Sequence, residues 1–415
     1  MVKLRLPVGR QSLSMDASGA ARTTRVVKTD LGLILVVLAL IVIGLVMVYS
    51  ASYGFAVLEG GLFEGRPTYF VRRQMLFAVG GLALLGGLTH VDYHVFTRRA
   101  VPILLATIGL LILTFFVGKT VGGATRWIFQ GSVQPSEMAR VGAVLYIAVW
   151  LASRGETLRA LDVGLVPFAL LLGLIAGLIV LQPDFSTAIL LVATGTAMFF
   201  VAGADMKQLL LAFLVGGVAV AVVGLAAPYR SSRVNLWLES PFSDALGRGF
   251  QVIQSLAALN KGGLVGIGLG QSQQKFAIYA PHTDGIFAVV GEEFGFVGTG
   301  LVIGLYALWT WRGMRIAWYA PDAYGTLLAV GIVSWVVFQA ILHIAVTTAS
   351  LPFTGTVLPF VSYGGSSLLA TLGSTGILLN ISRRGQRSGL GLWLSGSQGR
   401  PGYGAGGATG TQGAP

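Results

Sequence analysis

Long apolar segments alternate with short polar connections through most of the 415-residue chain. Ten of these segments reach or approach the length that an α-helix needs to cross the hydrocarbon core of a bilayer. They lie at 31–52, 74–88, 101–117, 139–152, 163–181, 187–203, 207–227, 285–311, 325–348 and 365–382. The second and fourth are short for a full span of roughly 20 residues. The pattern predicts an all-α polytopic membrane protein with about ten transmembrane helices.

One connection is much longer than the others: residues 228–284, between the seventh and eighth predicted spans. A connection of this length is usually functional. A polar, basic tail (1–30) and a Gly- and Ser-rich tail (384–415) flank the predicted membrane domain (31–383), and we expect both tails to be disordered. The first apolar run has no small-residue cleavage pattern after it, so it is interpreted as a span and not as a signal peptide.

Composition and charge support this organisation. The chain is 54% hydrophobic and only 11% charged, whereas a soluble domain carries about 25% charged residues. Ten spans put both tails on one side, and if that side is the inner one, 17 of the 28 Lys and Arg residues lie there. The short inner connections 89–100 and 312–324 are basic, as the positive-inside rule requires. We therefore expect cytoplasmic termini and an extracytoplasmic connection 228–284.

The same counts exclude several kinds of chemistry. The chain has no cysteine, and its four histidines are scattered, so thiol chemistry and Cys- or His-rich metal sites are excluded. No basic stripe is interleaved with aromatic residues, so nucleic acid is not an expected partner. There is no repeat of two halves, which argues against a transporter built on inverted repeats.

The densest polar cluster lies at 262–298, beside the eighth predicted span. Its glycines would let the backbone approach a ligand closely, and Lys275 is a point charge suited to phosphate. Asp284 immediately precedes the apolar run and is either a helix N-cap or a chemical group. His282 is predicted to orient or pack the loop. Glu292 and Glu293 lie two turns into the span, where carboxylates need partners, so we predict a structural role for them.

Two further clusters open predicted spans. In the connection 118–140, Arg126 and Trp127 lie in the middle, and the string Gln134-Pro135-Ser136-Glu137 predicts a helix start in which Ser136 can cap. Arg140 follows Glu137 by three residues, so an ion pair on one helix face is one interpretation of these two residues. Asp184 opens the sixth span, either as an N-cap or as an acid at the mouth of a cavity.

The last outer connection, 351–367, is rich in Pro, Gly and hydroxyl groups, including Ser362 and Ser366. Irregular backbone at membrane depth is tolerated only where it is buried in protein or lines a watery cavity. The segment is either a generic re-entrant loop or, as we predict, a cavity wall for a polar headgroup.

Taken in order, these segments resemble the SEDS family of peptidoglycan polymerases, which includes FtsW, RodA and SpoVE. The resemblance covers about residues 31–383. It rests on the strings VMVYSAS, YFVRRQ, GATRWI, QPSEMAR, LQPDFSTA, PYRSSRV, GGLVGIGLGQSQQK, HTDGIFAVVGEEFG and LPFTGTVLPFVSYGGSS. GLGQSQQK, VVGEEFG and LLNISRR are closer to the division and sporulation branch (FtsW type) than to the elongation branch. Arg140, Gly285 and His343 depart from the family's usual Lys, Phe and Asn.

The resemblance implies a glycosyltransferase that polymerises lipid II into glycan strands in cell division or cell-shape maintenance. It would form a β-1,4 bond with inversion and release undecaprenyl pyrophosphate. The family's essential acid corresponds to Asp284. Contacts with the substrate or its pyrophosphate are predicted for Arg126, Trp127, Gln134, Arg140, Lys275, Ser362 and Ser366. Supporting roles are predicted for Glu137, Asp184, His282, Thr283, Glu292 and Glu293.

The family also suggests a divalent cation, Mg²⁺ or Mn²⁺, and no organic cofactor. The implied partners are lipid II, the growing glycan chain, a class B penicillin-binding protein (a transpeptidase) and other membrane proteins of the divisome or elongasome. The implied location is the bacterial inner (cytoplasmic) membrane, with the active site on the extracytoplasmic face. Two alternatives stay open: a lipid II flippase, and a non-enzymatic scaffold of the division machinery for which Asp284 would be dispensable.

Overall fold

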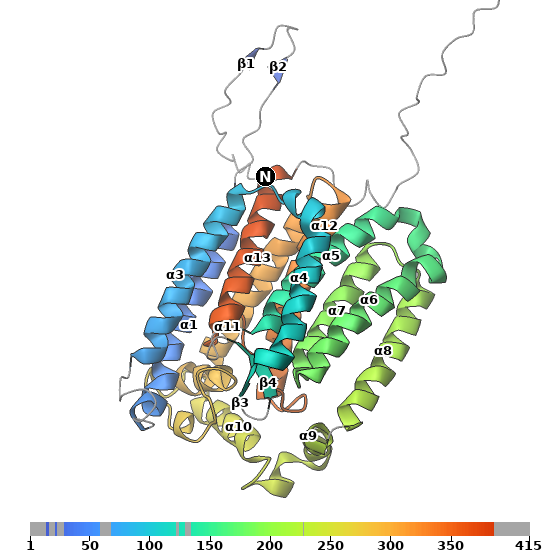
Figure 1. Ribbon diagram of the computed structural model, residues 1–415. Helices are drawn as coiled ribbons and strands as arrows, with labels where there is room; N and C mark the ends of the chain where they lie inside the picture. Colours follow the sequence, from blue (N-terminus) through green and yellow to red (C-terminus); the bar gives the residue numbers. More distant parts are fainter. Residues whose placement is uncertain are drawn as a thin grey trace, which may run out of the picture.

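The computed structural model describes residues 14–15, 21–22, 29–58, 68–121, 124–128, 134–226 and 228–385. Nearly all of the two predicted disordered tails lies outside these residues, so that prediction is untested. Each predicted span corresponds to one long helix (Figure 1). The ten helices are α1 (Leu31–Leu58), α3 (Tyr69–His90), α4 (Val95–Val117), α5 (Pro135–Arg154), α6 (Val166–Leu181), α7 (Phe185–Val201), α8 (Met206–Ala226), α11 (Ile286–Trp318), α12 (Ala323–Thr347) and α13 (Gly365–Arg384).

The helices confirm the all-α polytopic prediction. Seven helices within the described residues are long and apolar enough to cross a membrane, and α7 and α8 contribute shorter apolar helices. The two spans that look short in sequence are longer in the structure, at 22 residues for α3 and 20 for α5. Their first turns carry charged residues, such as Arg72 and Glu137, which an apolar pattern leaves out.

The helices divide into a buried centre and a lipid-facing periphery. Within their most apolar windows, 72% of α12 and 61% of both α5 and α11 is buried, against 22% for α3 and α4. Figure 1 shows α13 and α12 in the middle of the bundle, with α1 and α3 on one side and α6, α7 and α8 on the other. Large apolar side chains such as Phe116 and Phe213 are exposed on the outer helices, as expected where lipid is the solvent.

Most of the irregular structure gathers at one end of the bundle, here called the loop face (Figure 1). The predicted long connection is largely helical. The elements of the loop face are β3 (Lys119–Val121), β4 (Ala124–Trp127), α9 (Pro228–Glu239), η3 (Pro241–Asp244), α10 (Phe250–Gly262) and η4 (Gln274–Phe276). The short elements outside it are η1 (Gly155–Arg159), η2 (Leu161–Leu165) and the paired strands β1 (Ser14–Met15) and β2 (Ala21–Arg22).

Helix α11 is broken one-third of the way along, at Gly295, where φ is +63°. A break leaves backbone carbonyl and amide groups without their helical partners. Residues 263–268, just after α10, supply the missing partners through backbone hydrogen bonds. The four bonds run from Phe296 N to Gly263 O (2.9 Å), Val297 N to Leu264 O (3.0 Å), Ile267 N to Glu292 O (3.0 Å) and Gly268 N to Glu293 O (3.1 Å).

These four backbone hydrogen bonds explain why two positions in the cluster at 262–298 are glycine. A Cβ atom at Gly262 would lie 1.8 Å from the carbonyl oxygen of Gly291, and one at Gly266 would lie 2.1 Å from that of Glu293. Gly266 also has a φ of +83°, a conformation that side chains disfavour. The prediction that these glycines let the backbone approach a ligand is therefore wrong for Gly262 and Gly266. They let the end of α10 and residues 263–270, here called the glycine loop, approach α11.

Replacing Gly266 by Ala should destabilise the protein. The positive φ alone costs about 1–2 kcal/mol for a residue with a Cβ atom, and the overlap with Glu293 O adds to this. Gly300→Ala is the matched control, because Gly300 is an exposed helical residue of α11 with open space around its Cβ position. Thermal unfolding of the detergent-purified variants measures the difference. Equal midpoints for the two variants would contradict the role assigned to the glycine loop.

Candidate active site

Asp284 lies at the loop face, directly before α11. The N-cap residue of α11 is Gly285, so Asp284 lies one residue before the cap position. The Asp284 side chain is partly exposed. Its carboxylate is next to Gly355 in the connection between α12 and α13, since a Cβ atom built on Gly355 would lie 3.0 Å from Asp284 Oδ2. A glycine at 355 therefore leaves the space that the carboxylate occupies.

The backbone around Asp284 is held by the same connection. Ser362 Oγ donates a hydrogen bond to the carbonyl oxygen of Thr283 (2.8 Å) and accepts one from the amide of Leu358 (2.8 Å). Tyr363 N donates to the carbonyl oxygen of His282 (2.9 Å). Ser362 is buried, so in this structure it positions the segment that carries Asp284. Its predicted contact with the substrate is untested.

His282 packs this segment against α3. Its ring lies 4.4 Å from the ring of Phe70 and 5.5 Å from that of Tyr363, measured between centroids. Burial lowers the pKa of His282 to about 4, so the imidazole is neutral at neutral pH. The packing role predicted from sequence is confirmed. Gly285 is explained by the same crowding, because a Cβ atom there would lie 2.5 Å from Ile278 Cγ2.

Asp184 joins the starts of two helices. Its Oδ1 accepts from Thr187 N (3.3 Å), which confirms the N-cap interpretation for α7. Its Oδ2 accepts from Gln134 Nε2 (2.7 Å) and from Ser136 Oγ (2.8 Å), both at the start of α5. Ser136 therefore does not cap its own helix as predicted, because its hydroxyl is directed to Asp184. Gln134 is the N-cap residue of α5, and its backbone amide donates to the buried Ser366 Oγ (3.3 Å).

Glu137 and Arg140 form the ion pair that their spacing indicates, with 2.9 Å between Glu137 Oε1 and Arg140 Nη2. Both side chains are buried in the bundle. Arg140 also donates to Gln339 Oε1 on α12, and its guanidinium lies 4.8 Å from the centroid of the Trp335 ring. These contacts favour the ion-pair interpretation of Arg140 over the predicted binding of pyrophosphate.

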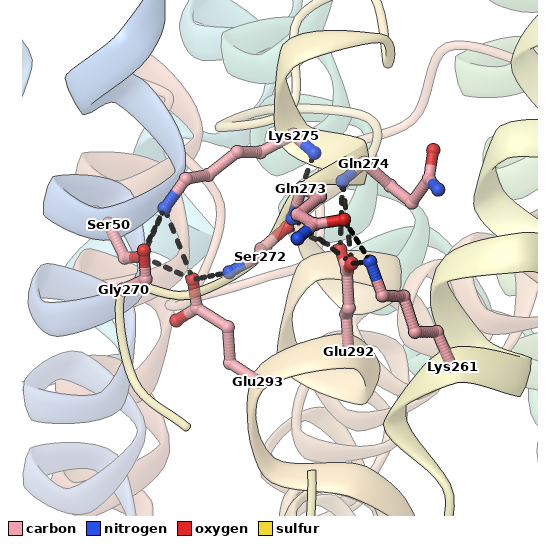
Figure 2. A network of polar contacts seen from close by, with 9 residues as sticks. All are labelled: Ser50, Lys261, Gly270, Ser272, Gln273, Gln274, Lys275, Glu292 and Glu293. Atoms are coloured by element: carbon pink, nitrogen blue, oxygen red, sulfur yellow. Dashed lines mark hydrogen bonds and ion pairs between the residues drawn. The ribbon is translucent and has the colours of Figure 1, made fainter. Parts of the chain in front are cut away.

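Glu292 and Glu293 also have the partners that their depth demands, as Figure 2 shows. Glu292 accepts hydrogen bonds from Ser272 Oγ and from the backbone amides of Gln273 (3.1 Å) and Gln274 (3.1 Å). Lys261 Nζ lies 3.8 Å from its Oε1. The structural role predicted for Glu292 is therefore supported by a complete set of donors.

Glu293 connects the glycine loop to α1. It accepts from Ser50 Oγ (2.5 Å), and Lys275 Nζ lies 3.4 Å from its Oε1 (Figure 2). Lys275 Nζ also donates to the carbonyl oxygen of Gly270 (2.7 Å), and the side chain is buried. Lys275 therefore neutralises Glu293 in this structure, and its predicted contact with pyrophosphate would require this pair to separate.

Arg126 and Trp127 lie in the predicted connection 118–140, on strand β4, which pairs with β3. Trp127 is partly exposed, whereas the Arg126 side chain is not among the described parts of the chain. Their contacts with the substrate stay predictions. No group of three or more His, Asp or Glu residues that could hold a metal ion occurs among the described residues.

Several residues of the site were not singled out in the sequence. They are Ser50, Gln74, Lys261, Gln339 and Gly355. Gln74, on α3, donates to Ser362 O (3.1 Å) and accepts from Gly364 N (3.2 Å). A polar residue inside an apolar span is itself a signal of an internal partner, and this could have identified Ser50, Gln74 and Gln339. His343, unexplained by the sequence, shares a 2.7 Å hydrogen bond between Nδ1 and Thr356 O.

The fold and site define a polytopic helical membrane protein whose partly exposed Asp284 lies on one face, held by buried polar contacts. A family model described as "Cell cycle protein", for FtsW, RodA and SpoVE, matches residues 31–387. The chain therefore belongs to the FtsW/RodA/SpoVE family.

Individual relatives agree with this assignment. The chain is 41% identical to stage V sporulation protein E of Bacillus subtilis, over 87% of this chain and 99% of that one. It is 39% identical to the probable peptidoglycan glycosyltransferase FtsW of Geobacter sp. strain M18, over 87% and 98%.

Solved structures are also similar. A chain in a structure that concerns coordination of polymerization and crosslinking by a peptidoglycan synthase complex has a TM-score of 0.70 and 32% identity, over 86% and 98% of the two chains. The rod shape determining protein RodA of Thermus thermophilus has a TM-score of 0.64 and 28% identity, over 87% and 98%.

The Lys275–Glu293 pair can be tested by a double-mutant cycle. Lys275→Met should destabilise the protein by about 3–5 kcal/mol, because it leaves a buried carboxylate without its cation. Adding Glu293→Gln removes the uncompensated charge and should restore most of the lost stability. Unfolding of the single and double variants in detergent gives the interaction energy. Strictly additive effects would show that the two side chains do not depend on each other.

Proposed function

We propose that this chain is a peptidoglycan glycosyltransferase that polymerises lipid II, with Asp284 as the general base. The observation that carries the proposal is a difference among the five carboxylates of the predicted site. Glu137 and Asp184 are 3% exposed, Glu292 0% and Glu293 1%. Asp284 is the one of the five that is partly exposed, so it is the carboxylate that a substrate can reach.

The proposed reaction needs one carboxylate. Asp284 takes the proton of the acceptor's 4-hydroxyl as that oxygen attacks the anomeric carbon of the donor. The bond from this carbon to the lipid pyrophosphate breaks on the opposite face of the ring, which inverts the configuration. Pyrophosphate leaves without needing a proton, whereas the leaving group in glycoside hydrolysis requires a second, acidic carboxyl group.

The negative charge of the pyrophosphate must be balanced. Arg140 and Lys275 are bonded inside the protein, so we assign this contact first to Arg126 on β4. A divalent cation suits a site with one carboxylate, since Mg²⁺ is commonly held by one or two carboxylates together with substrate phosphates. When bound, such a cation would help to neutralise the leaving pyrophosphate, while Asp284 takes the proton of the acceptor hydroxyl.

The side of the membrane and the partner follow from the same proposal. The loop face would be extracytoplasmic, in the cytoplasmic membrane of a bacterium, with both termini cytoplasmic. The partner would be a class B penicillin-binding protein that cross-links the strands, in keeping with a structural neighbour that comes from a peptidoglycan synthase complex. Sequence relatives named FtsW and stage V sporulation protein E favour a role in division or sporulation over elongation.

Asp284→Ala should reduce glycan synthesis by at least about 10²-fold, the typical contribution of a general base. The variant should still be inserted in the membrane, since Asp284 lies outside the spanning helix α11, before its N-cap position. The assay is polymerisation of purified lipid II by the detergent-purified protein with its transpeptidase. Asp162→Asn, at an exposed site in η2, is the control and should keep full activity. Normal glycan from Asp284→Ala would exclude Asp284 as the base, whereas no glycan from the wild-type protein would favour the flippase or the scaffold.

The stability-restored variant Lys275→Met/Glu293→Gln separates two roles of Lys275. If the lysine only neutralises Glu293, the double variant should polymerise lipid II at a rate within about threefold of the wild-type rate, because no catalytic contact is lost. A stable double variant that remains inactive would instead support the predicted contact between Lys275 and pyrophosphate.

A further inference from the structure

A cavity of about 160 Å³ lies on the loop face, and no residue assigned to the reaction so far lines it. Its walls come from α9, η3, α10 and the segment that follows α12. The lining residues used below are Ser232, Arg233, Trp237, Arg248, Gln251 and Phe353. Cavities for drug-sized ligands measure about 300–1,000 Å³, so this one fits a single ring or a short part of a polymer.

The cavity combines a fixed aromatic ring with polar groups. Trp237 is 37% exposed, and its Nε1 donates to the carbonyl oxygen of Ala349 (3.0 Å), which fixes the indole. Arg248 is 58% exposed and bridges two residues, with Nη1 donating to Ser232 Oγ (2.8 Å) and Nε to Asp244 Oδ2 (2.7 Å). Gln251 is held by a hydrogen bond from Nε2 to Tyr279 O (3.2 Å).

This chemistry suits a saccharide. A sugar ring has an apolar face that can lie against an indole, and hydroxyl groups that both donate and accept hydrogen bonds. The Arg248–Asp244 pair offers donors and acceptors side by side, and Ser232 and Gln251 add further polar groups. A phosphate is less well matched, because the Asp244 carboxylate offsets the charge of Arg248 and the Arg233 guanidinium lies 4.9 Å from the centroid of the Phe353 ring.

The cavity is also close to the proposed reaction centre. Phe353 lines the cavity, and its carbonyl oxygen accepts from Arg233 Nη1 (3.0 Å). Gly355, two residues further on, is the residue against the Asp284 carboxylate. Two residues span at most about 7 Å, so one glycan strand could contact both places. None of the lining residues lies on a membrane-spanning helix, so the cavity faces the side on which a growing strand would leave the lipid.

We propose that this cavity is a subsite for the glycan strand, in which a sugar ring stacks on Trp237 and its hydroxyls bond to Arg248, Ser232 and Gln251. The inference rests on the proposed function of Asp284. The subsite retains the strand between successive additions and thereby sets how many sugars are joined before the strand dissociates.

The first experiment measures the length of the glycan strands together with the rate of lipid II consumption, for the full chain with its transpeptidase. Trp237→Ala should shorten the strands several-fold, and by more than the rate falls. Trp237→Phe is the matched control: it keeps an aromatic ring but loses the hydrogen bond to Ala349, and should give strands of nearly wild-type length. Wild-type lengths from Trp237→Ala, or equal shortening in both variants, would overturn the proposal.

A binding experiment separates this proposal from the proposed function. Lipid-free chitotetraose, a β-1,4-linked N-acetylglucosamine oligomer, is titrated into Asp284→Ala, which should not turn over substrate. Saturable binding that is lost in Asp284→Ala/Trp237→Ala supports the subsite even if polymerisation is never observed. Binding of inorganic pyrophosphate at Trp237 in place of the oligomer, or oligomer binding that does not depend on Trp237, would overturn it.

Discussion

The loop face depends on the exchange of backbone hydrogen bonds at the break in α11. Without residues 263–268, two carbonyl groups and two amides near Gly295 would lack partners at membrane depth, where each unsatisfied group costs several kcal/mol. The break and the glycine loop therefore require each other. Because the loop lies between α10 and the segment that carries Asp284, this exchange also fixes the end of the long connection from which the proposed base extends.

The buried charged side chains, like the backbone groups at the break, have partners inside the protein. Glu292 and Glu293 lie on the turn just before the break, and their side chains bond to the chain that also supplies the backbone partners. Glu137 and Arg140 are the equivalent pair at the start of α5, joined to α12 through Gln339. The buried acids thus hold segments together, and this use of four carboxylates is what makes the partly exposed Asp284 stand out.

The apolar pattern predicts the order of the ten helices that correspond to the predicted spans, but not α9 and α10 in the long connection, and seven of the described helices are long and apolar enough to cross a membrane. The sequence also indicated the Glu137–Arg140 pair and the cap at Asp184, each as one of two interpretations, because both depend on near neighbours in the chain. The packing role of His282 was predicted without its partners, Phe70 and Tyr363, which are distant in the chain. The sequence could not predict that Ser136 bonds to Asp184, 48 residues away, or that Gly355 faces Asp284. Those contacts depend on how distant helices pack, which no local pattern records. A glycine that lets backbone approach backbone, as Gly262 and Gly266 do, looks the same in a sequence as a glycine that lets backbone approach a ligand.

Bonds between α9 and the connection after α12 have a mechanical consequence. Trp237 and Arg233 on α9 donate to the carbonyl oxygens of Ala349 and Phe353, and Ser362 in the same connection donates to Thr283 O beside Asp284. Helix α9 begins one residue after α8, whose outward apolar side chains include Phe213 and Leu214. A line of covalent and hydrogen bonds thus links α9 to the segment that carries Asp284, so a displacement of α9 would reach that segment along the loop face.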